Sequence, residues 1–91
     1  MKYVMFKRNG SEDDLQHFVP IIFPNNLVHI MVADSMTAPG APLEGYMPVS
    51  AGEVSPIDMK CYGESSTLKM HADEDRDSRI VLMNDYGGGF A

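Results

Sequence analysis

Residues 17–37, HFVPIIFPNNLVHIMVADSMT, constrain the fold of this chain more than any other stretch. The nearly continuous apolar segment at residues 18–23 predicts a buried β-strand. Pro24 ends that strand, and the asparagine pair after it can cap a helix that the apolar pattern predicts from residue 27 to about residue 36. Pro20 lacks an amide donor, which favours an edge strand or a bulge, whereas the apolar composition favours a central strand. The sequence leaves both positions open.

The remaining segments predict a small sheet around this helix. Residues 2–8 predict a first strand. Residues 46–50 and 54–62 predict extended structure interrupted at Ala51-Gly52, residues 67–70 predict brief pairing, residues 73–77 predict a loop or a helix start, and residues 79–83 (RIVLM) predict the last strand. The order β-β-α-β-(β)-β is typical of an α+β fold. We therefore expect a mostly antiparallel sheet of four to five strands with one helix packed on one face.

Composition limits the domain organisation and the kinds of partner. A chain of 91 residues predicts a single globular domain, which we place at residues 1–86, followed by a flexible tail at residues 87–91. A net charge of −6 argues against non-specific binding to nucleic acid. No apolar run is long enough to cross a membrane. The single cysteine and the charged start, which does not fit a signal peptide, together predict a cytoplasmic protein.

Candidate metal ligands do not form a recognisable motif. The three histidines and the cysteine show no tight ligand spacing such as C-x-x-C. Asp73, Asp75 and Asp77 alternate as the first ligands of an EF-hand loop do. The pattern then fails, because Ser78 stands where that loop needs glycine and Asn84 where it needs glutamate. We predict no metal and no cofactor, and we interpret the acidic run as a solvated segment.

One segment carries nucleophile-like chemistry. Residues 61–67, CYGESST, contain a cysteine, two serines and a threonine, but they lack the second glycine of a nucleophile elbow and no helix is predicted after them. An alternative function is therefore a small thiol or serine hydrolase centred on Cys61, Ser65 and His71. A half-buried cysteine in a strand is the more ordinary interpretation. We accordingly predict that the protein is not an enzyme and assign no catalytic residue.

Several short motifs resemble a known group of proteins. They are F-P-x-x-L-V-H at residues 23–29, P-V-S-A-G at residues 48–52, C-x-G-x-S-x-T-L at residues 61–68, and the acidic stretch that leads to Ile80. In this order they resemble small uncharacterised bacteriophage and prophage proteins. That group carries no catalytic assignment, so no active site transfers. The resemblance implies a small accessory protein in the cytoplasm of a bacterial host, where such proteins often act by binding host or phage assemblies.

A binding role also follows from the apolar strands. Residues 3–6, 18–23 and 80–83 are apolar on both faces, and one helix can cover only one face of a sheet. Uncovered apolar surface usually becomes an interface, and a homodimer is its simplest form. An acidic inhibitor that docks on a host or phage complex and a minor virion structural protein remain alternatives. The predicted contacts are a helix flank formed by His29, Ile30, Ala33 and Met36, with a charged rim formed by Asp73, Asp75 and Asp77.

Overall fold

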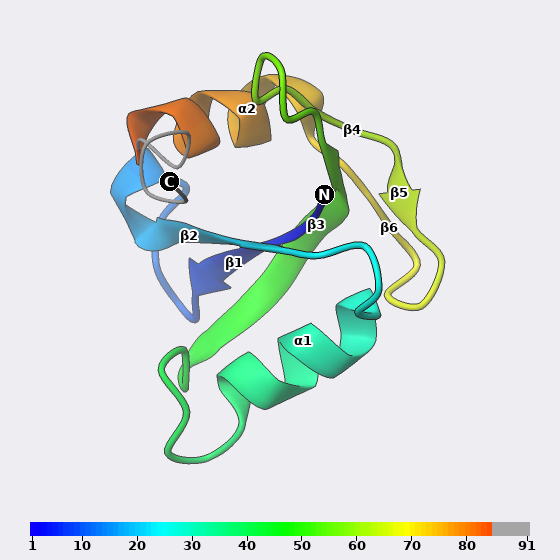
Figure 1. Ribbon diagram of the computed structural model, residues 1–91. Helices are drawn as coiled ribbons and strands as arrows, with labels where there is room; N and C mark the ends of the chain where they lie inside the picture. Colours follow the sequence, from blue (N-terminus) through cyan, green and yellow to red (C-terminus); the bar gives the residue numbers. More distant parts are fainter. Residues whose placement is uncertain (85–91) are drawn as a thin grey trace.

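The computed structural model describes residues 1–84 (Figure 1). The predicted tail at residues 87–91, and the end of the predicted domain at residues 85–86, lie outside the described residues. The elements follow in the order β1 (Lys2–Arg8), the 3-10 turn η1 (Leu15–His17), β2 (Phe18–Phe23), α1 (His29–Thr37), β3 (Tyr46–Val54), β4 (Cys61–Tyr62), β5 (Glu64–Ser65), β6 (Met70–His71) and α2 (Glu74–Met83).

A four-stranded antiparallel sheet with the order β2-β1-β3-β4 forms the centre of the molecule. Tyr3 of β1 lies opposite Ile22 of β2 on one side and Gly52 of β3 on the other. Strands β5 and β6 form a separate two-stranded hairpin. The predicted α+β class and the mostly antiparallel sheet are confirmed. Strand β2 is an edge strand of its sheet, which is the position that Pro20 favours.

Strand β3 is longer than the sequence predicts. It continues from Tyr46 to Val54 through the Ala51-Gly52 pair, where an interruption is predicted. Glycine is required at this point, because a Cβ atom on Gly52 would overlap the backbone oxygen of Tyr62. The close approach of two backbones, rather than a break in the strand, explains this glycine.

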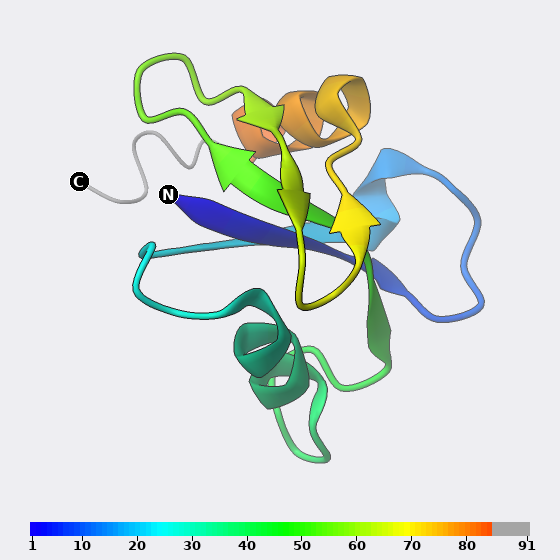
Figure 2. The same ribbon diagram turned by 90° about the vertical axis from the view of Figure 1, so that its right-hand side faces the viewer.

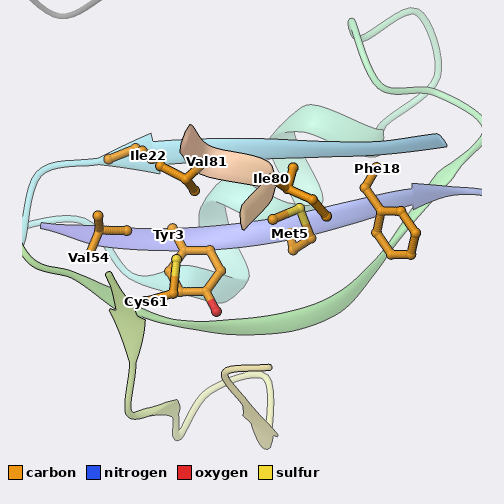
Figure 3. Close-up of a cluster of buried hydrophobic side chains, with 8 residues drawn as sticks. All are labelled: Tyr3, Met5, Phe18, Ile22, Val54, Cys61, Ile80 and Val81. Atoms are coloured by element: carbon orange, nitrogen blue, oxygen red, sulfur yellow. The ribbon is translucent and has the colours of Figure 1, made fainter. Parts of the chain in front are cut away.

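The two helices lie on opposite faces of the sheet (Figures 1 and 2). Alternate side chains of β1 point to opposite faces, as the pleat of a strand requires. Tyr3 and Met5 belong to the cluster on the α2 side, whereas Val4 and Phe6 belong to the cluster on the α1 side. All four side chains are fully buried. Figure 3 shows the cluster on the α2 side, which contains Tyr3, Met5, Phe18, Ile22, Val54, Cys61, Ile80 and Val81.

The prediction of a last strand at residues 79–83 is wrong, because these residues form the second half of α2. The side chain of Asp73 caps this helix by accepting a hydrogen bond from the Arg76 amide, at 3.2 Å. Three acidic residues in the first turn suit the positive end of the helix dipole. Ile80 and Val81 pack on the sheet, so they are the buried side of an amphipathic helix rather than a strand.

The second helix covers the face of the sheet that the sequence analysis expects to be uncovered. With α1 on one face and α2 on the other, each apolar face of β1 is buried within the chain itself. The argument that a second copy must cover the sheet is therefore wrong.

Candidate functional site

Helix α1 begins without a capping side chain of its own. Its N-cap residue is Val28, not the asparagine pair that the sequence predicts. The hydroxyl of Thr67, in the hairpin formed by β5 and β6, instead accepts a hydrogen bond from the amide of Ile30 at 3.2 Å. The ammonium group of Lys2 donates to the carbonyl oxygen of Leu27 at 2.9 Å. Two segments that are distant in the sequence therefore hold the start of this helix.

The outer side of α1 and of the two residues before it is apolar and exposed. We call this surface the α1 face, and it consists of Leu27 (41% exposed), Val28 (36%), Ile30 (39%) and Met31 (62%). Beside it lies an apolar groove of about 300 Å³, which is lined by Phe23, Leu27, Met31, Val32, Ser35 and Met36. Together the exposed fractions amount to roughly 350 Å², which is the size of the largest, often functional, apolar patches on monomeric proteins.

The predicted helix flank is largely the inner side of α1. His29 and Ala33 are buried. The Nε2 atom of His29 lies 2.9 Å from the carbonyl oxygen of Gly52, and its ring packs edge-on against Phe23 with the ring centres 5.5 Å apart. Only Ile30 among the four predicted residues is exposed, and Met36 is partly buried. Because the helix is apolar nearly all round, its sequence does not reveal which side faces the sheet.

The predicted acidic rim is divided between surface and core. Asp73 and Asp75 are exposed on α2, whereas Asp77 is fully buried. All three lie on the opposite side of the sheet from α1 (Figure 1). The structure therefore does not bring the acidic residues and the helix flank together into one surface.

Asp77 is the centre of a buried polar network that the sequence did not predict. Its Oδ2 atom accepts hydrogen bonds from the Tyr3 hydroxyl (2.5 Å), the Ser50 hydroxyl (2.5 Å) and the Asp73 amide (3.2 Å). Its Oδ1 atom pairs with Nε of Arg76 at 3.1 Å. Nη2 of the same arginine donates to Ser50 Oγ at 2.8 Å. The network joins α2 to β1 and β3.

The guanidinium group of Arg76 also closes the network toward the surface. It lies over the ring of Phe18, 4.8 Å from the ring centre, and its side chain is about one quarter exposed. Among the described residues, no buried side-chain nitrogen or oxygen lacks a hydrogen-bond partner. A network in which every buried group is paired stabilises a single position of the helix. We infer that the network around Asp77 holds α2 in a fixed position on the sheet.

The Tyr3 phenol and the Cys61 thiol are buried in their protonated forms on the α2 side, which predicts a loss of stability at high pH. Burial and the hydrogen bond to Asp77 raise the pKa of Tyr3 far above its usual 10.0, and burial raises the pKa of Cys61 from 9.0 to about 11. The unfolded chain releases these protons first, so their stabilising effect is complete below pH 9 and is lost as pH rises. Each such group lowers the free energy of unfolding by about 1.4 kcal/mol per pH unit in its range.

The measurement is urea unfolding at several pH values from about 8 to about 11. The Tyr3→Phe variant removes the phenol, so we expect its stability to fall less steeply above pH 10 than that of the parent chain, by about 1.4 kcal/mol per pH unit. The Cys61→Ala variant should instead flatten the curve between pH 9 and about 11. Parallel curves for the parent chain and Tyr3→Phe would contradict the assignment of Tyr3.

The three residues of the hydrolase alternative do not share a site. Cys61 packs in the buried cluster on the α2 side, and its raised pKa keeps the thiol protonated, and so a poor nucleophile, at neutral pH. The hydroxyl of Ser65 accepts a hydrogen bond from the Leu68 amide within the hairpin, at 3.2 Å. His71 is exposed on β6. Within residues 1–84 no hydrogen bond joins any two of the three, so the geometry gives this alternative no support.

Residues 1–84 contain no group of three or more His, Cys, Asp or Glu side chains that could hold a metal ion. None of the helices in this part of the chain has the length and apolar character needed to cross a membrane.

Comparison with protein-family models, with curated proteins and with solved structures found no match. The resemblance to phage proteins therefore remains a prediction.

Proposed function

We propose that this chain acts by binding protein through the α1 face, as a small accessory protein of the phage type in the cytoplasm of a bacterium. The observation that supports the proposal is the apolar surface of Leu27, Val28, Ile30 and Met31, which remains exposed although both faces of the sheet are covered. None of these four side chains belongs to either core cluster. Apolar patches of this size on monomeric proteins are often functional.

The form of the surface supports a small and reversible contact. Roughly 350 Å² of apolar area is less than half of the approximately 800 Å² per partner that a standard stable interface buries. The groove beside the α1 face, about 300 Å³ in volume, can accept an apolar side chain of the partner. Two methionines, Met31 and Met36, line it, and methionine adapts readily to different surfaces.

Photochemical crosslinking in bacterial cells tests the proposal directly. Replacing Met31 by p-benzoylphenylalanine places a photoreactive group on the α1 face. The same replacement at Met83 is the matched control, because this residue is also 62% exposed but belongs to α2 on the other side of the sheet. We expect discrete protein adducts from position 31 at several times the yield from position 83. Equal or absent adducts at the two positions would contradict the proposal.

A charge on the α1 face should prevent the contact. Met31→Lys places an ammonium group where the partner excludes water, and we expect it to weaken binding by about tenfold or more. Met83→Lys should leave binding unchanged. For this measurement the photoreactive residue replaces neighbouring Ile30. The adduct yields are then compared between chains that carry Met31→Lys and chains that carry Met83→Lys. Undiminished adducts with Met31→Lys would place the interface elsewhere.

A further inference from the structure

We propose that the partner on the α1 face is a second copy of this chain, with the two α1 helices packed antiparallel about a two-fold axis at Met31. This inference rests on the proposed binding role of the α1 face and names its occupant. The first support is the distribution of charge. Two copies that each carry a net charge of −6 repel one another, so they can meet only where acidic groups are sparse.

The α1 face is such a place. Asp34 is the one acidic or basic residue, histidine aside, among residues 27–37, and it is exposed. Two of the acidic clusters lie elsewhere, at residues 12–14 in the loop before η1 and at residues 73–75 at the start of α2. Asp13 is in addition paired with Lys7, at 2.6 Å.

The second support is that the two ends of the α1 face carry opposite charges. At the N-terminal end, the Lys2 ammonium is bound to the Leu27 carbonyl, next to the positive end of the helix dipole. At the C-terminal end, Asp34 follows Met31 by three residues and so lies on the same side of the helix. Met31 is halfway between Val28 and Asp34. A two-fold axis at Met31 therefore places Asp34 of each copy opposite the Lys2 end of the other.

The same arrangement buries the apolar side chains of the α1 face against one another. Met31, the most exposed apolar residue of α1, meets its counterpart on the axis, and Leu27 and Ile30 of each copy lie on the N-terminal side of Met31. An interface of this kind is isologous, so one pair of charges occurs twice and the assembly closes at two copies. The small area implies a dimer in rapid exchange with the monomer rather than a permanent one.

Analytical ultracentrifugation from about 10 μM to about 1 mM tests the pairing. The parent chain should shift from monomer to dimer with rising concentration, and Met31→Lys should abolish the shift while Met31→Leu retains it. Asp34→Lys places two lysines opposite one another at each contact, and Lys2→Glu places two carboxylates there. Each variant alone should associate at least about fivefold more weakly than the parent chain.

An equal mixture of the Asp34→Lys and Lys2→Glu chains gives the decisive result. In a heterodimer, the lysine introduced at position 34 of one copy meets the glutamate introduced at position 2 of the other. The second contact pairs the retained Lys2 with the retained Asp34, so both contacts are attractive. We expect the mixture to show a higher average mass than either variant alone at the same total concentration. A mixture that behaves as the average of its components would overturn the antiparallel arrangement, even where each variant is fully folded.

Failure of this inference is distinguishable from failure of the binding role. A parent chain that remains monomeric up to about 1 mM overturns self-pairing. Crosslinks from position 31 to other proteins would in that case still support the proposed function. Crosslinked dimers that form from position 30 in the parent chain, and that are lost when the chain also carries Met31→Lys, support both.

Discussion

Replacing Asp77 by alanine is expected to lower the free energy of unfolding by about 3–5 kcal/mol, which is the cost of removing one partner from a buried ion pair. The carboxylate is fully buried and accepts from Tyr3, Ser50 and the amide of Asp73 while it pairs with Arg76. Its loss leaves two buried hydroxyl groups without their acceptor. A loss of this size is comparable with the whole stability of many small domains.

Two further substitutions identify the cause. Asp75→Ala removes an exposed carboxylate from the first turn of the same helix, and we expect a change within about 0.5 kcal/mol. Asp77→Asn keeps the volume and one acceptor but loses the ion pair, so an intermediate loss of about 2 kcal/mol is expected. Urea unfolding monitored by circular dichroism gives all three values. A loss below about 1 kcal/mol for Asp77→Ala would show that the network does not hold α2 in place.

The second large effect is expected for Gly52→Ala. The added Cβ atom would overlap the Tyr62 backbone oxygen and lie 3.2 Å from the backbone carbon of Gly63. Because both neighbours are backbone atoms, the β3–β4 pairing has to open to admit the methyl group. We expect a loss of about 2–4 kcal/mol in the free energy of unfolding, which is the usual range for overpacking and strand displacement.

Gly45→Ala is the matched control for this effect. Gly45 has a φ of +88°, and a Cβ atom there meets nothing within 4 Å. Its substitution therefore carries only the cost of a left-handed backbone, about 1 kcal/mol. Thermal and urea unfolding of the two variants separate the steric cost from the conformational one. Equal losses for Gly52→Ala and Gly45→Ala would contradict the close approach of β3 to residues 62–63.

Local patterns in the sequence were sufficient for much of the fold. The alternating and continuous apolar runs at residues 2–8 and 18–23 predicted β1 and β2, and the segment after Pro24 predicted α1. The extended structure predicted at residues 54–62 is wrong at residues 56–58, which form a turn. The assignment of residues 79–83 is also wrong, because five apolar or bulky residues in a row fit a strand and a helix equally well. The deciding signal lay before them. Asp73 caps the helix and acidic residues fill its first turn, and both features are visible in the sequence.

The candidate sites were harder to predict, because they depend on contacts between distant residues. His29 faces inward, where its Nε2 atom lies within hydrogen-bond distance of the carbonyl oxygen of Gly52, 23 residues away in the sequence. Asp77 is buried with Tyr3, which lies 74 residues before it, and with Ser50, which lies 27 residues before it. No periodicity in the sequence connects such residues. The outward side of α1 could therefore be identified only from the folded arrangement.

The central position of β1 has a consequence for how the chain is made. Its neighbours in the sheet are β2 and β3, and its Tyr3 is bound to α2, so β1 needs the last described helix before both of its faces are covered. Contacts between residues that are far apart in the sequence form slowly during folding. During synthesis, the apolar side chains of β1 on the α2 side stay uncovered until α2 has been made. We expect chaperone binding to the nascent chain during that interval to limit aggregation of the incomplete protein.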